Sequence, residues 1–420
     1  MKIRISTVLS ELGLILLIGS AFIYEVIRAL VGDKAYIALV VCGTVCLALW
    51  GLYGRTLNKI AIKKFVPWVI LGFLSFWRNA EVSHGVYNTE LLFILYLFSA
   101  LILSGKNGWQ DRACKIIETF GSIHVFATLI LFVFRGFYGY IEPIWGYYPT
   151  GTDNGAAGYR AALTTHYSQN ATYIVLVLLV VGSRLLCQEK NKRKKKDVIW
   201  FLLILLALLL TSKRGHLMFG LAALVAVYYV LNPLKKESKI SKLVIGGFGL
   251  AVVITILFQV MPTTFDVILG RFVNSGYDDI TSGRIPMWML AVSLFVQNPI
   301  LGIGWSGYKY QYRSHIWAGY NPKTALLNTH NVYLQLLCEI GIVGFLVFLI
   351  GIIQHMSSLL KLSKELDRNS NDLRTILAVS FGMTVYFLMY SVTGCCLYDL
   401  TFHIYIICVA MGLALKRKEE

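Results

Sequence analysis

The chain has 420 residues, of which 57% are hydrophobic and only 15% are charged, and its mean hydropathy is +0.65. This composition excludes an ordinary soluble domain and predicts a protein that uses the lipid bilayer as its solvent. The formal net charge of +17 would suit a nucleic-acid-binding protein, but Lys and Arg occur in short clusters between apolar stretches, as topology signals of membrane proteins do. We therefore expect no nucleic-acid partner.

Apolar runs of about 17 to 25 residues recur along the chain and predict about twelve transmembrane helices in one polytopic membrane domain, residues 1–420. No small-residue cleavage site follows the first run, so the stretch from Leu9 to Leu30 is interpreted as a retained span and not as a signal peptide. The twelve spans are expected to centre near Ile18, Val41, Leu71, Leu95, Thr128, Val177, Leu205, Val225, Val253, Ile342, Thr384 and Ile406.

The connections between these spans predict their orientation. The two ends of the chain and every second connection carry 25 of the 39 Lys and Arg residues, which places that side in the cytoplasm. The densest cluster, residues 188–197, is interpreted as a topology determinant more readily than as a site for anionic lipid. Both termini are therefore expected in the cytoplasm.

Two connections on the opposite side are long enough to carry function, at residues 138–169 and 262–328. Both are rich in Tyr, Trp, Gly and Asn, residues that suit carbohydrate because rings stack on sugar C–H faces and amides pair with hydroxyls. An interfacial aromatic belt explains some of them equally well. Within the larger loop, Pro286 to Gln297 predicts a short apolar helix, which Asn298 and Pro299 end.

Several weaker patterns carry no expected chemistry. The eight cysteines lie in or beside apolar spans without CxxC spacing, so neither a disulfide framework nor a zinc site is predicted. The GIGWSG stretch at residues 302–307 is interpreted as a tight turn and not as a phosphate loop. Asp278 and Asp279 are interpreted as solvated loop residues, and no metal or cofactor is expected.

Ionisable residues at membrane depth are expensive and therefore mark candidate functional positions. Arg214 lies in a very short external connection together with Lys213 and His216, where a snorkelling anchor is the alternative. Arg284 precedes the short loop helix, and Arg160 lies in the first external loop; solvated loop arginines are the alternative for both. Guanidinium groups converging from separate segments would form a clamp for a diphosphate.

His330 is the candidate base, because a neutral imidazole near pH 7 can take a proton from a sugar hydroxyl as its oxygen attacks. It opens a span in the sequence THNVYLQLL, with Thr329 as a candidate N-cap and Asn331 as a candidate accessory residue. A structural role is the alternative for a single histidine, and His166 and His315 are weaker rivals on the same side.

The order TSKRG, GRIPMW, NPILGIGWSGY and NTHNVYLQLLCEIGIVG resembles the O-antigen ligase and polymerase superfamily, the Wzy-type and WaaL-type transferases of lipid-linked glycans. The close match covers roughly residues 211–344. The resemblance implies an all-α integral membrane fold of the GT-C-like kind, with a large external loop subdomain containing short helices. It also implies an inverting, metal-independent glycosyl transfer at the outer face of the cytoplasmic membrane.

By the same resemblance, Arg214 and Arg284 would bind the diphosphate of a polyprenyl-linked donor, with Arg160 as a looser third match, and His330 would act on the acceptor hydroxyl. His216 is a departure from the small or apolar residue commoner beside that arginine. The expected function is polymerisation of lipid-linked repeat units into O-antigen, capsule or another surface glycan. The expected partners are donor and acceptor glycans, membrane lipid, a chain-length regulator and a flippase.

Two other functions stay open at this point. A ligase that transfers the finished glycan to a lipid or cell-wall acceptor would share these motifs, whereas a transporter of the lipid-linked oligosaccharide belongs to a different class. A transporter is expected to carry charges or broken helices near the bilayer midplane in related halves, and the sequence shows neither clearly. A shape-determining cell-wall polymerase would need an acidic loop motif, which is not evident.

Overall fold

A computed structural model describes residues 5–53, 59–80, 88–145, 158–188, 194–231, 241, 284–315, 328–366 and 371–415. Within these residues all regular structure is helical, apart from an isolated β-bridge between Asn79 and Trp305. Eight helices are long and apolar enough to cross a membrane. The prediction of an all-α membrane protein is therefore confirmed.

The helices fall into two groups by length and position. The helices at the expected spans are α1 (Ile5–Leu14), η1 (Ile15–Gly19), α2 (Ser20–Phe22), α4 (Asp33–Leu52), α5 (Lys59–Trp77), α6 (Asn88–Ser104), α7 (Gln110–Val133), α9 (Tyr167–Cys187), α10 (Lys195–Leu210), α11 (Arg214–Leu231), α16 (Val332–Glu365), α17 (Asn371–Tyr390) and α18 (Leu400–Leu413). The helices in the connections are α3 (Tyr24–Val31), η3 (Arg135–Phe137), α8 (Tyr138–Trp145), η4 (Gly158–Arg160), α14 (Arg284–Gln297) and α15 (Tyr308–His315).

The expected count of twelve spans is not confirmed. Each of the expected centres that the structure describes lies in a helix, but α6, α10 and α18 have only 17, 16 and 14 residues. The span expected near Val253 lies outside the described residues. The described helices therefore agree with the predicted order of spans, and eight of them meet the length needed to cross.

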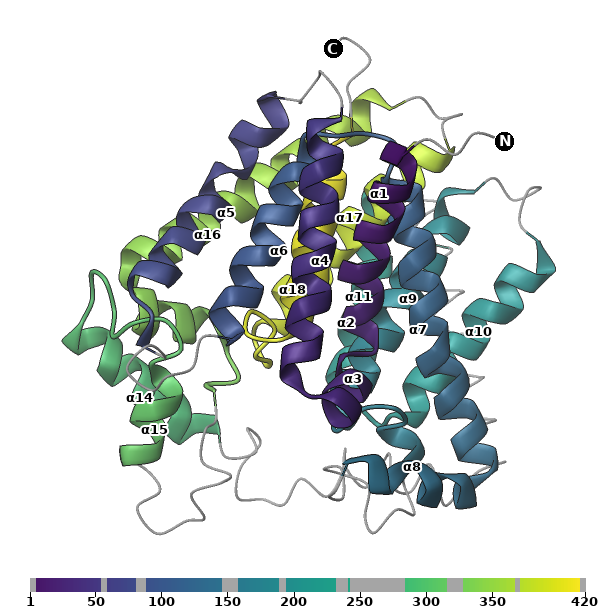
Figure 1. Cartoon of the computed structure of the whole chain (residues 1–420), viewed down its shortest axis with the longest axis horizontal. Coiled ribbons are helices and arrows are strands. Elements are labelled where there is room, and N and C mark those ends of the chain that lie inside the picture. Colours follow the sequence, from purple (N-terminus) through teal and green to yellow (C-terminus); the bar gives the residue numbers. More distant parts are fainter. Residues whose placement is uncertain are drawn as a thin grey trace.

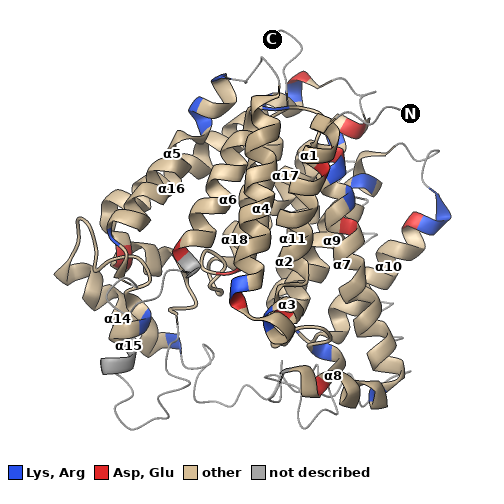
Figure 2. Cartoon of the chain, viewed as in Figure 1, with Lys and Arg blue, Asp and Glu red and all other residues tan. Residues whose placement is uncertain are grey.

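Burial separates central helices from peripheral ones. In the apolar part of α9, 78% of the residues are buried, and in α17 67% are, whereas in α4, α7 and α11 the share is 33%. The peripheral helices instead expose large apolar side chains, such as Phe73 and Phe76 of α5, each 64% exposed. Charged residues lie mainly toward the helix ends, and the middle parts of the helices are largely free of them (Figure 2). An apolar outer surface of this kind fits contact with lipid.

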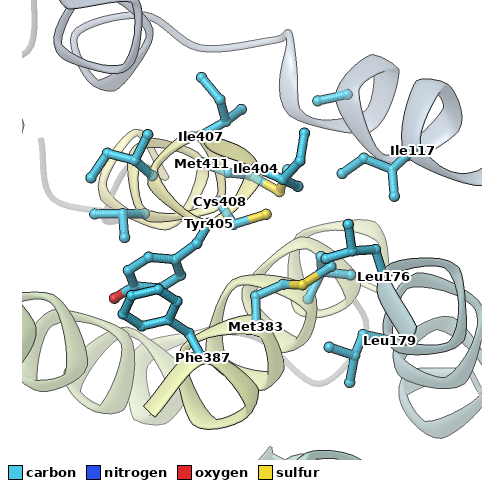
Figure 3. Close-up of a cluster of buried hydrophobic side chains, with 14 of the residues drawn as sticks. Ile117, Leu176, Leu179, Met383, Phe387, Ile404, Tyr405, Ile407, Cys408 and Met411 are labelled. Atoms are coloured by element: carbon cyan, nitrogen blue, oxygen red, sulfur yellow. The ribbon is translucent and has the colours of Figure 1, made fainter. Parts of the chain in front are cut away.

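The core forms where α7, α9, α17 and α18 meet (Figure 3). Phe387 of α17 and Tyr405 of α18 stack with their ring centroids 4.0 Å apart. The sulfur atoms of Cys114 and Met411 lie 3.8 Å apart, so Cys114 is part of this apolar packing. Four cysteines are buried as the sequence predicted, namely Cys114, Cys338, Cys396 and Cys408, whereas Cys42 is exposed and does not belong to the core.

The short connecting helices gather at one end of the bundle. α3, α8, α14 and α15 all lie in the lower part of Figure 1, at the end opposite to the start of α1, with α14 and α15 on the left and α8 on the right. α14 confirms the predicted short helix in the larger loop, and its residues Met287, Ala291 and Leu294 pack with Tyr308 and Cys338 in a separate small core. The start of α16 and part of the larger loop therefore form one packed unit.

The long span α16 is broken at Gly341, whose φ of 64° and ψ of −170° are not helical. The backbone of residues 299–304 enters the gap: Ile342 N–H donates to the Pro299 carbonyl at 2.9 Å, and Ile303 N–H donates to the Cys338 carbonyl at 2.9 Å. A Cβ atom on Gly341 would lie 2.1 Å from the Ile300 carbonyl oxygen, so only glycine fits. The sequence did not predict this break.

The GIGWSG stretch forms the expected tight turn. Gly302 and Gly304 have φ values of 64° and 107°, and Gly307 N–H donates to the Gly304 carbonyl at 3.0 Å. Arg78, just after α5, donates from Nη2 to the Gly302 carbonyl at 2.9 Å. The turn is thus held between the end of α5 and the middle of α16, and it fixes the connection from α14 to α15.

Candidate active site

A cavity of about 670 Å³ lies at the end of the bundle that carries the connecting helices. Three cationic side chains line it, those of Lys213, Arg214 and Arg284, and they come from two segments about seventy residues apart. The His330 side chain lines the same cavity. The two arginines and the histidine that the sequence singled out therefore share one cavity.

The starts of five helices surround this cavity: α9, α11, α14, α16 and α18. Arg214 and Arg284 are the first residues of α11 and α14, His166 and Asp399 are the N-caps of α9 and α18, and His330 stands two residues before α16. Unpaired backbone N–H groups and the helix dipole make such ends electropositive. Helix starts and cationic side chains together favour an anion in this cavity.

The charge balance of the cavity wall is positive. Among the described lining residues, Asp399 is the acid that faces Lys213, Arg214 and Arg284. The Lys213 ammonium lies 4.1 Å from the centre of the Tyr167 ring, a cation–π contact that holds it at the cavity rim. Two planar guanidinium groups and one ammonium group match the oxygens of a diphosphate in charge and in hydrogen-bonding capacity.

Arg214 owes its place to the shortest connection between spans in the described chain. Only Thr211, Ser212 and Lys213 separate α10 from α11, and Ser212 has a φ of 59°. The Thr211 hydroxyl donates to the Leu208 carbonyl at 2.7 Å and accepts the Lys213 N–H at 3.3 Å, which closes the turn. A turn this tight presents both basic residues at the helix start.

His330 lies in a strained and partly buried position. Its φ is 54°, an uncommon value for a residue other than glycine, and its Nδ1 lies 3.5 Å from the Cys395 sulfur. Burial, together with the nearby positive charges of Arg284 and Lys213, lowers the pKa of His330 to about 4. The imidazole is therefore neutral at pH 7 and able to accept a proton.

The N-cap of α16 is Asn331 and not Thr329, which corrects the prediction from the sequence. The Asn331 side chain accepts the Leu334 N–H at 3.1 Å. Thr329 instead accepts the Asn331 N–H at 3.0 Å and donates to the Asn331 carbonyl at 2.7 Å. Its hydroxyl thus braces the turn that contains His330, which explains how the strained φ of His330 is maintained.

His216 is a wall residue whose two ring nitrogens are both engaged. It is 2% exposed; Nε2 lies 2.8 Å from the Ser168 hydroxyl and Nδ1 lies 2.6 Å from the Tyr386 hydroxyl. These contacts join α11 to α9 and α17. His216 lines the cavity, but its hydrogen bonds give it a positioning role.

Arg160 does not line this cavity among the residues that the structure describes. It is 2% exposed, its guanidinium lies 6.0 Å from the Tyr159 ring centre, and its carbonyl accepts a hydrogen bond from Asn170 at 2.8 Å. The sequence predicted Arg160 as a looser third member of the diphosphate clamp, and the described lining of the cavity that holds Arg214 and Arg284 does not include it. Asp278 and Asp279 lie outside the described residues.

The segment between α17 and α18 contributes to the site without having been predicted. Thr393, Cys395 and Asp399 of this segment line the cavity, as does Thr401 in the first turn of α18. Asp399 Oδ1 accepts the Thr401 N–H at 2.8 Å, and burial raises the pKa of Asp399 to about 6. A carboxylate just before an apolar run was the signal available in the sequence, since Asp is a preferred N-cap.

Glu339 supports the site from outside the cavity. It is fully buried in α16, and its carboxylate accepts the backbone N–H groups of Ser306 at 2.9 Å and Tyr308 at 3.1 Å. It also accepts hydrogen bonds from Gln335, at 3.2 Å, and from the Tyr398 hydroxyl. One side chain therefore joins the glycine turn, the start of α16 and the segment that leads to Asp399.

A comparison with known protein families covers part of the chain that carries this site. The family model described as O-Antigen ligase (Wzy_C) matches residues 199–349, a range that contains Arg214, Arg284 and His330. The resemblance to the O-antigen ligase and polymerase superfamily is thereby confirmed. No curated protein matches the chain.

Proposed function

Because residues 199–349 carry the O-antigen ligase domain, we propose that this chain is a membrane glycosyltransferase that joins polyprenyl diphosphate-linked repeat units into a surface polysaccharide. The observation that carries the proposal is the cavity in which Lys213, Arg214 and Arg284 face a neutral His330 amid the starts of five helices. A site of this kind suits a substrate that already carries a diphosphate and gains charge on it during reaction.

The reaction has one proton to move and one bond to exchange. The acceptor hydroxyl oxygen attacks the anomeric carbon of the donor sugar from the face opposite the diphosphate, which inverts the configuration. The carbon–oxygen bond to the diphosphate breaks, its electron pair leaves with the phosphate oxygen, and Arg214 and Arg284 stabilise the growing charge. The hydroxyl proton passes to His330.

His330 suits this role in its neutral form. When Nδ1–H is directed at the Cys395 sulfur, 3.5 Å away, Nε2 keeps its lone pair for the acceptor proton. The pKa of about 4 belongs to the free site. A bound diphosphate neutralises the nearby cations and raises the pKa, which makes the imidazole a stronger base when donor is present.

The proposed location is the cytoplasmic membrane, with both termini in the cytoplasm and the cavity at the outer face. The basic clusters at the ends of the chain and in alternate connections support this orientation. In this location the donor and the growing chain meet at the outer face of the cytoplasmic membrane, where a flippase and a chain-length regulator are the expected partners.

A ligase is the second candidate, and the description of the matching family model favours it. A ligase uses the same diphosphate leaving group but transfers the finished glycan to a different lipid or to a wall acceptor. The two activities differ only in the acceptor, so the same cavity chemistry serves both.

Reconstitution of the full chain in liposomes with one lipid-linked repeat unit, without added divalent metal, tests the proposal. A ladder of multimers on a gel is the expected result for the polymerase. Transfer to an added distinct acceptor, with no multimers, indicates the ligase. Passage of the repeat unit across the bilayer with no new glycosidic bond would overturn the proposal in favour of a transporter.

A further inference from the structure

A second cavity, of about 370 Å³, adjoins the first. Gln169, Asp399 and Leu400 line both cavities. The rest of its wall comes mainly from α3 and the start of α4, an external connection to which the proposed mechanism assigns no role. Its volume is within the range of roughly 300–1,000 Å³ that small-molecule sites occupy.

The two cavities differ in charge. Among the lining residues that the structure describes, the cations of the first cavity outnumber the carboxylate of Asp399, whereas the second cavity contains Glu25, Asp33 and Asp399 against Arg28. Arg28 and Asp33 pair with each other at 3.3 Å, and both side chains are half exposed. The second cavity is therefore left with two carboxylates and disfavours a phosphate or a uronic acid.

Glu25 is the side chain that marks this cavity as a built site. It is 2% exposed, and its Oε2 has no hydrogen-bond partner among the residues that the structure describes. Burial raises its pKa, and hydrogen bonding by Gln169 partly offsets that rise. A buried carboxylate oxygen without a donor is unfavourable, so a ligand that donates an O–H or N–H group to it gains affinity.

The aromatic part of the wall suits a sugar ring. Tyr24 lies against Tyr36, with ring centroids 4.6 Å apart at an angle of 62°. Tyr398, which directly precedes Asp399 in the sequence, lines the same cavity. The Tyr36 hydroxyl is held by the Tyr96 hydroxyl at 3.2 Å, which fixes the ring against which Tyr24 packs. Partly exposed tyrosine rings offer faces to sugar C–H groups.

We propose that the second cavity is a sugar subsite, in which Glu25 accepts hydrogen bonds from a neutral or amino sugar of the glycan next to the reacting ring. The inference rests on the proposed function, because it assigns a glycan ring to the space beside the diphosphate cavity. Sugars that carry a carboxylate are excluded by Glu25 and Asp399.

Binding of separate probes tests this inference apart from the proposed function. The purified full chain in detergent is titrated at pH 6.5 with glucosamine, glucose and glucuronate, followed by saturation-transfer NMR, and with inorganic diphosphate, followed by calorimetry. We expect glucosamine to bind more tightly than glucose, and glucuronate to bind least. Glu25→Gln should weaken glucosamine binding about tenfold and leave diphosphate affinity unchanged.

Matched variants keep the outcome clear. Glu142→Gln removes a carboxylate of α8 that lines neither cavity, and should change no affinity. Tyr24→Leu should weaken all three sugars to a similar extent, and it serves as the second variant if Glu25→Gln does not fold. Sugar binding that survives both variants, or that diphosphate competes away, overturns the subsite.

Transfer assays distinguish whether the sugar in the second cavity belongs to the acceptor glycan or to the donor. A raised KM for acceptor in Glu25→Gln assigns the subsite to the acceptor glycan, and a raised KM for donor assigns it to the donor; either result supports the subsite. Absence of diphosphate binding and of transfer, with the order of sugar affinities intact, contradicts the proposed function and leaves the subsite standing.

Discussion

Tyr398 donates a hydrogen bond to the Glu339 carboxylate and so ties the segment before α18 to the broken span α16. The same carboxylate accepts two backbone N–H groups from the glycine turn. Neither residue lines the large cavity, yet Tyr398 directly precedes Asp399, which does. The wall of the site is therefore set by a buried carboxylate outside it.

Glu339→Gln should slow transfer while leaving the KM for donor nearly unchanged. The amide keeps one oxygen but turns an N–H group toward backbone donors, which leaves buried groups unsatisfied and costs about 1–3 kcal/mol. We expect a lower melting temperature and a kcat reduced about tenfold or more. Tyr398→Phe removes one hydrogen bond only and should show a smaller loss. A change confined to KM, with kcat intact, would contradict the positioning role.

Glycine substitutions test the break in α16. Gly341→Ala combines a φ of 64° with a Cβ only 2.1 Å from the Ile300 carbonyl oxygen, so it should destabilise the protein by more than the roughly 1–3 kcal/mol of backbone strain alone. Gly32 has a φ of 97° with open space around it, and Gly136 has open space without a positive φ. The measurement is the melting temperature of each alanine variant in detergent.

The three glycine variants should rank in a fixed order. Gly136→Ala should behave like the wild type, Gly32→Ala should lose stability moderately, and Gly341→Ala should lose the most, because only the last adds a clash with backbone. Equal melting temperatures for Gly32→Ala and Gly341→Ala would mean that the inserted loop moves away freely and that the break is not fixed.

Much of the fold could be predicted from local sequence patterns. The features that the sequence did not predict depend on contacts between distant parts of the chain. Apolar runs predict helices because each run must satisfy its backbone within itself in lipid, so α9 and α17 were placed well. The break at Gly341 depends on a loop that begins some forty residues earlier in the chain, and no local pattern encodes that approach. Gly341 is visible in the sequence, but the reason that it must be glycine, a positive φ beside another stretch of backbone, is visible only in the folded structure.

The residues of the candidate site also include some that the sequence predicted and some that it did not. Arg214, Arg284 and His330 were predicted because each begins a helix at the expected external side, where charge is exceptional. Asp399 was missed because its cavity role depends on how α17 and α18 return to α11. Arg160 was the looser match in sequence, and in the structure it is buried, with its guanidinium 6.0 Å from the Tyr159 ring centre and its carbonyl bonded to Asn170.

Arg284→Ala and His330→Ala should abolish long-chain glycan and leave membrane insertion intact. Loss of a charge-stabilising donor lowers kcat by about 10²–10³, and loss of the base lowers it by about 10²–10⁴. The measurement is the glycan ladder from reconstituted protein, with protein level determined by immunoblot. Arg135→Ala is the matched control, since Arg135 is exposed at η3 and does not line the cavity.

Arg284→Lys separates charge from geometry in the same assay. Lysine keeps the positive charge but not the planar fork, so partial activity indicates that charge dominates, and none indicates bidentate binding. A normal ladder in both Arg284→Ala and His330→Ala would contradict the proposed chemistry.

The pH dependence of transfer should report the low pKa of His330. Its pKa of about 4 keeps the free imidazole neutral above about pH 5, and base function is lost as pH falls through 4. We therefore expect the acid limb of kcat/KM well below 6.5. The acid limb of kcat should lie at higher pH, because a bound diphosphate raises the pKa.

Variants of the cavity residues test whether the acid limb of kcat/KM comes from His330. Lys213→Met removes a positive charge that lowers the pKa of His330, so the acid limb of kcat/KM should move to higher pH, while Lys309→Met, outside the cavity, should not move it. Asp399, with a pKa of about 6, and His166, with a pKa of about 4, also line the cavity, so Asp399→Asn and His166→Asn remove any limb that those groups cause. An acid limb near 6.5 that persists in Asp399→Asn would show that His330 is not held in the electropositive, buried setting that the structure gives it.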